Sequence, residues 1–454
     1  MTEERYDELL NLLDSKDYAS FMRKIDDVNP IDAADFLMSL PEERQLAVFR
    51  MFKKDTAAEI FAELDSEIQE RIVSTATDSE LAVMLDELYV DDAVDMLEEL
   101  PAGMVKKILR AAKPETRQLI NKFLSYPEDS AGSIMTAEFI DLRGSMTVSE
   151  AILHIRNTGV DKETVYAAYV TDNSRVLKGT IKLEDLIFAD SGDKISDIMD
   201  EDFVCAGTYD DKETVASLIS KYDILALPVV DKEMRLVGIV TVDDAMDVME
   251  DEATEDIEMM AAITPTDKPY LKTSVFETWK KRIPWLLLLM VSATFTGQII
   301  TGFEAALGAF PMLISFIPML MDTGGNSGGQ ASVTIIRGLA LGEIRMRNIL
   351  EVLWKEFRVA IMCGVVLAVC NFIKILLVDN LLFGNGIDVI SALVVCLTLV
   401  VTVVVSKLVG CSLPILAKRI GFDPAVMASP FITTIVDAIS LIIYFKFAQI
   451  FLHV

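Results

Sequence analysis

Five apolar runs in the C-terminal part of the chain restrict its fold more than any other feature of the sequence. Each run approaches or exceeds the roughly 20 residues with which a helix crosses a bilayer. The runs lie at residues 283–302, 309–334, 359–378, 389–413 and 425–452 of the 454-residue chain. Backbone polar groups in lipid must be satisfied within their own segment, so the runs predict five membrane-spanning helices.

The charged residues divide the chain into two physically different parts. Residues 1–275 contain 60 acidic and 28 basic side chains, whereas residues 276–454 contain 10 acidic and 13 basic ones. Outside the runs, the basic residues precede the first run and lie between runs two and three and runs four and five, while the other two connections have none. The positive-inside rule therefore predicts a cytoplasmic acidic part and an extracytoplasmic C-terminus. The polar start, MTEERYDELL, is not typical of a cleavable signal peptide.

Residues 1–129 have the pattern of a helical repeat. The stretches DFLMSLPEERQLAVFRMF and EIFAELDSEIQERIVSTA each place a leucine before a turn and an amphipathic helix after it. The leucines beside such turns recur regularly, the first three at equal intervals and the last after half of that interval: Leu40, Leu64, Leu88 and Leu100. This period predicts a superhelical array of short helices.

Residues 130–250 contain an internal duplication. AYVTDNSRVLKGTIKLEDL (168–186) aligns with PVVDKEMRLVGIVTVDDAM (228–246), so that Asp172, Gly179 and Asp185 match Asp231, Gly238 and Asp244 at a constant offset of 59 residues. The pattern predicts two copies of a β-hairpin followed by a helix. The next segment, 251–277, starts within MEDEATEDIEMMAAI (249–263), which we interpret as an acidic helix leading towards the membrane domain, 278–454.

An ionisable residue lies inside the last apolar run, PFITTIVDAISLIIYFK (430–446). On a helix, Ser429, Thr433, Asp437, Ser440 and Tyr444 fall within an arc of roughly 80°, which predicts a polar face. Lys446 would lie about half a turn round the helix and is a poor partner for Asp437. An unpaired charge in lipid costs several kcal/mol, and facing water and a cation avoids this cost. The alternative is a protonated or hydrogen-bonded carboxylic acid between helices.

Mg²⁺ suits a single membrane carboxylate, because it prefers oxygen ligands and keeps several waters. Two subunits that each supplied Asp437 would match its charge. The second run, FIPMLMDTGGNSGGQAS, contains helix-weakening glycines and prolines. They either present carbonyl groups and Asn326 to a pore or allow close helix packing. No Gly-Lys-Ser/Thr sequence follows, so the run is not a Walker A motif and an ATP-driven pump is not expected.

The order of these segments is similar to that of a known family. The duplicated unit, with GIVTVDD in its second copy, resembles a pair of CBS domains. Together with YPEDSAGSIMT, DTGGNSGGQAS, IRGLALGEI and the five runs, nearly the whole chain resembles the MgtE family of magnesium channels. The resemblance implies a multidomain membrane protein with an all-α superhelical N-terminal domain, an α+β CBS-domain pair, a linking plug helix and a five-helix all-α transmembrane domain. It also implies a homodimer in the cytoplasmic membrane, with no enzymatic activity and no nucleic-acid partner.

The resemblance further implies where ions bind. Asp437 would be the central ligand of the pathway, with Ser429, Thr433 and Asn326 around it. Clustered carboxylates repel one another and bridging divalent cations relieve the repulsion, so high cytoplasmic Mg²⁺ is expected to draw the cytoplasmic parts together and shut the pore. The expected metal ligands besides Asp437 are Asp91, Asp95, Asp223, Asp244, Asp247, Glu252, Glu255, Asp256 and Asp423, with Asp92 in the same cluster as Asp91.

CBS pairs often bind adenosine nucleotides, which makes ATP a candidate modulator. Thr241 and Asp244 in the second copy match the hydroxyl and carboxylate of that pattern, whereas the first copy has Lys182 in place of the hydroxyl.

Two other functions remain open from the sequence. A membrane-anchored nucleotide or ion sensor would show no flux and would tolerate Asp437→Ala, and an exchanger of divalent cations would need a Na⁺ or H⁺ gradient. The five cysteines have no paired spacing and are expected to be reduced. The two histidines are far apart in the chain and give little support to a zinc or copper site.

Overall fold

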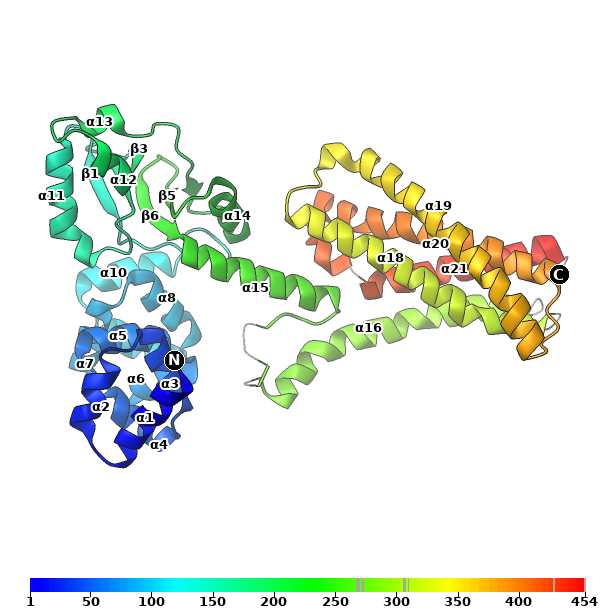
Figure 1. Cartoon of the computed structure of the whole chain (residues 1–454), viewed down its shortest axis with the longest axis horizontal. Coiled ribbons are helices and arrows are strands. Elements are labelled where there is room, and N and C mark those ends of the chain that lie inside the picture. The colour runs from blue at the N-terminus through cyan, green and yellow to red at the C-terminus, as the bar shows by residue number, and fades with distance from the viewer. Residues whose placement is uncertain (267–269, 272, 305–307, 309, 428, 453–454) are drawn as a thin grey trace. The chain divides into compact units, whose positions relative to one another are not determined.

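The computed structural model describes residues 1–266, 270–271, 273–304, 308, 310–427 and 429–452. The chain forms two compact units, Met1–Met249 and Glu250–Val454. Within the described residues the first unit begins with ten short helices, the helical domain (Figure 1). These helices are α1 Glu3–Asp14, α2 Tyr18–Ile25, α3 Pro30–Ser39, α4 Glu42–Phe49, α5 Lys54–Ala62, α6 Ser66–Thr75, α7 Asp78–Glu87, α8 Val90–Glu99, α9 Ala102–Ala111 and α10 Pro114–Phe123.

The repeat of the helical domain has a hydrogen-bonding basis. Gln45 and Gln69, which occupy equivalent positions in successive repeats, are both buried. The side-chain amide of Gln45 donates to the Leu40 carbonyl at 2.9 Å, and that of Gln69 donates to the Phe61 carbonyl at 2.9 Å. Each glutamine thus satisfies a carbonyl at the C-terminal end of the preceding helix. The predicted helical repeat is confirmed.

The duplication forms two small sheets of identical topology. In each, a parallel pair is followed by an antiparallel hairpin, in the order β1-β2-β3 and β4-β5-β6. The register shifts in the two hairpins, at Val170/Thr171 and Val229/Val230, fall at equivalent positions of the duplicated sequence, as the alignment predicts. The elements are β1 Ile140–Arg143, α11 Val148–Thr158, η1 Gly159–Asp161, β2 Ala167–Thr171, β3 Leu177–Lys182, α12 Leu183–Phe188, α13 Ile195–Ile198, β4 Ala206–Gly207, α14 Lys212–Tyr222, β5 Ala226–Val230 and β6 Leu236–Thr241.

The two copies and the helical domain are joined by buried contacts. The Tyr169 hydroxyl of the first copy donates to the Ala226 carbonyl of the second at 2.9 Å. One hydrophobic cluster contains Ile120 and Phe123 of the helical domain together with Val215 and Leu227 of the second copy. The helical domain therefore packs against the second copy within the first unit.

The acidic linker is the end of a longer helix than the sequence pattern indicates. Helix α15 runs from Val242 to Met260 directly after β6. It is continuous through residue 250, where the sequence pattern placed a domain boundary. The helix thus leaves the second copy without a break.

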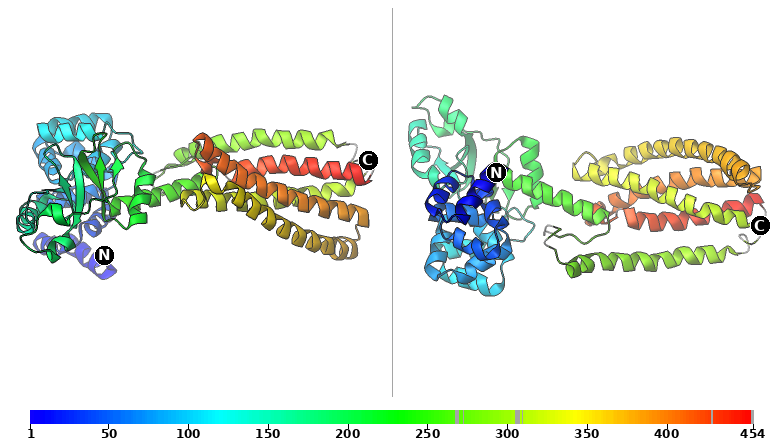
Figure 2. Two further views of the ribbon diagram at one scale, coloured as in Figure 1. Left: turned by 90° about the horizontal axis from the view of Figure 1, so that it is seen from above. Right: turned by 60° about the horizontal axis from the view of Figure 1, so that its bottom comes forward.

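The second unit contains the long helices α16 Val275–Gly302, α18 Ile317–Ala340, α19 Ile349–Lys374, α20 Val389–Ile420 and α21 Ser429–Leu452 (Figure 2). Short turns η2 Pro311–Phe316, η3 Met346–Asn348 and η5 Pro424–Met427 precede α18, α19 and α21, and α19 ends in a π-helix, η4 Ile375–Leu382. Each of the five predicted spans overlaps one of the long helices. Several begin earlier or end later than the apolar runs, because their charged ends remain helical.

Four of these helical segments are long and apolar enough to cross a membrane among the described residues: Val275–Gly302, Met346–Leu382, Val389–Ile420 and Pro424–Leu452. Helix α18 does not reach that hydropathy because glycines and polar residues interrupt it. At 1.5 Å per residue its 24 residues still extend about 36 Å, more than the roughly 30 Å hydrocarbon core. The chain is a multi-pass membrane protein.

Candidate ion pathway and acidic interface

Asp437 lies in the middle of α21 and is half-buried. Within the described part of the chain its carboxylate takes part in no ion pair or hydrogen bond. Lys446 is exposed and donates to Gln449 at 3.3 Å, as expected for a residue on another side of the helix. Asp437 is therefore a membrane carboxylate without a protein counter-ion among the described residues of the single chain.

The glycines of α18 serve close helix packing, the alternative that the sequence left open. A Cβ on Gly324 would lie 2.9 Å from the Thr402 methyl of α20, and one on Gly325 would lie 2.8 Å from the Thr433 methyl of α21. A Cβ on Gly410 would lie 2.2 Å from the Gly328 carbonyl oxygen. The hydroxyl of Ser406 donates to the Gly324 carbonyl. Gly324 and Gly328 thus pack inside the helix bundle, and the interpretation of their carbonyls as pore-lining is wrong for this conformation.

Close packing of the glycine face leaves a different face of α18 exposed. Five exposed polar residues on this face share an arc of about 120° and form what we call the polar stripe: Asp322, Asn326, Gln330, Thr334 and Arg337. The exposed Val333 lies within the same arc. The Asn326 amide donates to the Asp322 carboxylate at 3.1 Å. Asp322 is also close enough to act electrostatically on Asp437. Sequence reasoning identified Asn326 but missed Asp322, although its position four residues earlier in the same run was a usable signal.

The predicted polar face of α21 is only partly open. Thr433 is half-buried, its methyl packs on Gly325, and its hydroxyl donates to the Pro430 carbonyl at 2.9 Å. Ser440 and Tyr444 are buried, and the Tyr444 hydroxyl donates to the Leu313 carbonyl at 3.0 Å. The side chain of Ser429 lies outside the described residues. Asp437 and Thr433 remain as the accessible part of the predicted face.

Carboxylates of the helical domain and of the two copies converge in the first unit. This acidic interface consists of Asp91 and Asp92 in the first turn of α8, Glu163 after η1, and Asp244 in the first turn of α15. One buried oxygen of Asp91 and one of Glu163 have no hydrogen-bond partner among the described residues. Sequence reasoning placed Asp91, Asp92 and Asp244 among acidic clusters, but it missed Glu163, which no motif marks.

The acidic interface is electrostatically unfavourable in the absence of cations. Burial, followed by the charge of Asp92, raises the pKa of Asp91 well above its usual range. Burial and the charge of Asp244 raise the pKa of Asp92 to about 6 and that of Glu163 to about 7. The pKa of Asp244 is raised by burial, although hydrogen bonds from Thr241 oppose the shift. Burial is the main cause of all four shifts, and for Asp91, Asp92 and Glu163 the charges of neighbouring carboxylates add to it.

The other predicted metal ligands are spread over several elements. Asp95 and Asp247 lie on the exposed sides of α8 and α15, and Asp223 ends α14 in a left-handed conformation with φ of 51°. Asp423 accepts the Ala425 amide at 2.7 Å. Glu252, Glu255 and Asp256 follow one another along the distal part of α15. No group of three or more His, Cys, Asp or Glu side chains within the described residues has the arrangement of a metal site.

The distal end of α15 contacts the membrane helices within the second unit. Met259 and Met260 pack against the cluster of Ile336 in α18 and Ala425 in η5. The Lys281 ammonium at the start of α16 donates to the Pro265 carbonyl, and Glu258 accepts the Thr266 amide at 3.0 Å. The linker helix therefore ends beside the C-terminal end of α18 and the turn before α21.

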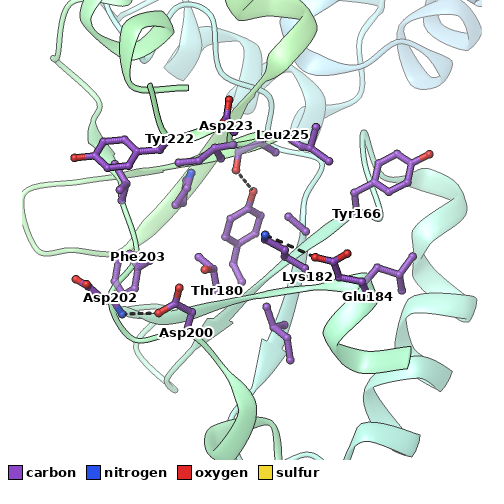
Figure 3. A pocket seen from close by; sticks show the side chains of 18 of the residues that line it. Tyr166, Thr180, Lys182, Glu184, Asp200, Asp202, Phe203, Tyr222, Asp223 and Leu225 are labelled. Atoms are coloured by element: carbon purple, nitrogen blue, oxygen red, sulfur yellow. Dashed lines mark hydrogen bonds and ion pairs between the residues drawn. The ribbon is translucent and has the colours of Figure 1, made fainter. Parts of the chain in front are cut away.

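A cavity of about 570 Å³ lies between the two copies of the duplicated unit (Figure 3). Its lining includes Tyr166, Lys182 and Glu184 from the first copy and Tyr222 and Asp223 from the second. Lys182 is 3.7 Å from Glu184. Thr241 and Asp244, the predicted nucleotide ligands, hydrogen-bond to each other and are not among the lining residues. The nucleotide assignment of that pair stays a prediction.

Comparisons with known proteins agree with this architecture. Three family models match the chain: a divalent cation transporter model, MgtE, over residues 317–447, the MgtE intracellular N domain over residues 28–129, and a CBS domain over residues 195–251. The magnesium transporter MgtE of Thermus thermophilus is 36% identical, and that of Bacillus subtilis is 32% identical. These alignments cover 98% and 99% of this chain and 98% of each relative.

Two solved structures resemble about half of the chain. One, described as the soluble part of a magnesium transporter, is 34% identical with a TM-score of 0.53, and the match covers 55% of this chain and 99% of that structure. The other, the cytosolic domain of the Mg²⁺ channel MgtE in complex with ATP, is 36% identical with a TM-score of 0.51, and the match covers 54% and 99%.

Proposed function

The chain belongs to the MgtE family of divalent cation transporters, and we propose that it is a Mg²⁺-selective channel that admits magnesium down its electrochemical gradient. The observation that carries this proposal is the pair of polar features that the membrane bundle leaves open. Asp437, which has no partner among the described residues, and the polar stripe of α18 are both too polar for contact with lipid. A hydrated cation and water satisfy them.

The same two features support a homodimer. A two-fold axis beside α18 and α21 would place two polar stripes and two Asp437 carboxylates around one pathway. Two carboxylates balance the charge of one Mg²⁺, which keeps most of its water ligands. Asn326 and Thr433 would line this pathway next to Asp437. The distribution of basic residues supports a cytoplasmic N-terminus and an extracytoplasmic C-terminus.

We further propose that cytoplasmic Mg²⁺ closes the channel through the acidic interface. The interface joins the helical domain to the duplicated unit, and α15 connects that unit to the turn before α21. A bridging divalent cation would replace the repulsion among Asp91, Asp92, Glu163 and Asp244 with attraction. Few protein ligands are needed, because Mg²⁺ commonly uses one or two carboxylates and several waters.

The function is tested by Mg²⁺ influx into liposomes that contain the full-length protein and no other ion gradient. We expect uptake that follows the Mg²⁺ gradient and membrane potential and that falls when Mg²⁺ bathes the cytoplasmic face. Uptake only with an imposed Na⁺ or H⁺ gradient would favour a coupled exchanger. No uptake under any condition would favour a sensor and would overturn the proposal.

We propose that the cavity between the two copies binds ATP, as the ATP complex of the related cytosolic domain suggests. Lys182 would attract the phosphates, and the tyrosines would contact the base. This site differs from the Thr241 and Asp244 pair that the sequence indicated.

Calorimetric titration of the full-length protein with ATP tests this site. We expect Lys182→Ala to weaken ATP binding by about tenfold, because one charge-assisted contact with phosphate is lost. Lys194→Ala, which removes an exposed lysine beside α13, should bind ATP like the wild type. Absence of binding to the wild type would dismiss nucleotide modulation.

A further inference from the structure

A buried ion pair lies between two membrane helices and has no part in the proposed pathway. The ammonium of Lys407 in α20 is 3.7 Å from the carboxylate of Glu356 in α19. Only 7% of the Lys407 side chain and 13% of the Glu356 side chain are exposed. Each charge has been removed from water and depends on the other for compensation. An ionisable pair in this setting calls for a functional explanation.

The pair lies at a junction of three helices. A hydrophobic cluster beside it contains Ala331 and Ile335 of α18 and Cys411 of α20, with Val352 and Leu353 of α19 packed against it. Cys411 is one helical turn from Lys407, and Val352 is one turn from Glu356. The ion pair therefore extends the contact by which α19 and α20 hold this part of α18.

Two further contacts show that α19 and α20 have a single antiparallel register. A Cβ on Gly364 of α19 would lie 3.2 Å from the Val400 Cα of α20. Farther along, the Asn371 amide donates to the Cys396 sulfur at 3.8 Å. Residue numbers rise on α19 as they fall on α20 from the ion pair through both contacts. A one-turn slip of either helix would leave two buried charges unpaired, so the pair specifies this register.

Contacts between α20 and α18 make the position of α18 depend on the position of α20. Ser406, the neighbour of Lys407, donates to the Gly324 carbonyl, and Gly410 packs directly on the Gly328 backbone. Both contacts are too close to accommodate a shift without separating the helices. The position of the polar stripe thus depends on where α20 sits against α19.

We propose that Glu356 and Lys407 are positioning residues of the ion pathway. Their ion pair fixes α20 on α19, and α20 in turn holds α18 with its polar stripe towards the permeating ion. This role rests on the proposed channel function, and it assigns neither residue a direct contact with Mg²⁺.

The test compares single, paired and conservative variants of the full-length protein by Mg²⁺ influx into liposomes. Lys407→Met and Glu356→Gln should each lower the maximal flux by about tenfold or more, because a displaced pathway group loses most of its effect. The Mg²⁺ concentrations for half-maximal flux and for cytoplasmic inhibition should stay unchanged, since no ion ligand is altered. Lys407→Arg and the exchanged pair Glu356→Lys with Lys407→Glu should recover at least half of the wild-type flux.

Lys446→Met is the matched control, because it removes an exposed lysine of α21 that hydrogen-bonds to Gln449 and lies outside the contact between α19 and α20. Wild-type flux in both single variants, or an exchanged pair as impaired as they are, would overturn the inference. If a single variant fails to fold, the exchanged pair and Lys407→Arg decide. Recovery of at least half of the wild-type flux supports the inference, and lower flux overturns it. If the wild type shows no flux, the proposed function fails and the inference fails with it. If the wild type transports Mg²⁺ and the variants show one of the contrary results above, only the inference fails.

Discussion

Replacing Asp437 with asparagine is expected to lower Mg²⁺ flux by at least about 100-fold. A carboxylate near a cation contributes about 4 kcal/mol per unit charge at 4 Å and an effective permittivity of 20, and each 1.4 kcal/mol is a factor of ten. Asparagine keeps the size and hydrogen-bonding capacity of the side chain but removes its charge. The measurement is Mg²⁺ influx into liposomes at equal amounts of reconstituted protein.

Asp388→Asn provides the matched control for this experiment. Asp388 caps α20 by accepting the amides of Ile390 and Ser391 at 3.1 and 3.0 Å, a role that asparagine retains. The control should therefore transport at the wild-type rate. Undiminished flux in the Asp437 variant would mean that this carboxylate is not in the pathway, and that ions cross elsewhere or not at all.

The position of Asp437 could be anticipated because one charge in an apolar run contrasts with everything around it. Which other residues on the same face of the helix are accessible was harder to predict. Helical periodicity placed Ser440 and Tyr444 on the same face as Asp437, but both are covered by other helices. Periodicity gives the face of a residue, whereas the neighbouring helices determine whether that face is open.

The second apolar run, 309–334, shows the same limit of prediction from sequence. Its glycines were compatible with either pore-lining carbonyls or close packing, and only the positions of Thr402, Ser406 and Thr433 decide for packing. That outcome then exposes the Asp322 and Asn326 face. A single sequence contains no information on which helix fills the glycine face, so it does not show which face remains open.

Residues that act through contacts between distant segments were missed. Glu163 stands in the short mixed-charge stretch DKE (161–163) and in no acidic cluster, and it joins the acidic interface only because its loop lies beside α8 and α15. Lys407 was visible as a charge within the run 389–413, but Glu356 stands among Lys355 and Arg358 and resembles part of a membrane boundary. The fold that brings these residues together is needed to identify them.

Neutralising the acidic interface is expected to abolish feedback by cytoplasmic Mg²⁺. In the double variant Asp92→Asn with Asp244→Asn, half of the four carboxylates lose their charge while the side chains keep their shape. Because the bridging ion loses oxygen ligands and the repulsion it relieves, the Mg²⁺ concentration for half-maximal inhibition should rise by about tenfold or more. Protease protection of the 251–277 linker should likewise lose its dependence on Mg²⁺.

Glu43→Gln with Glu67→Gln is the matched control, because it removes two exposed carboxylates from the same helical domain. It should retain wild-type inhibition and Mg²⁺-dependent protection. If linker cleavage in the wild type does not change with Mg²⁺, or if the interface variant keeps full inhibition, closure does not act through this interface.

The pH dependence of the same protection assay gives an independent test of the charge mechanism. The pKa values of Asp92 and Glu163 in the folded protein are about 6 and about 7, above the roughly 4 of unfolded carboxyls. The folded interface therefore binds protons between about pH 4 and pH 7, and its stability falls as pH rises through this range. Added Mg²⁺ should consequently increase protection strongly at pH 8 and only slightly at pH 5.5. An equal effect at both pH values would show that Mg²⁺ does not act by relieving carboxylate repulsion.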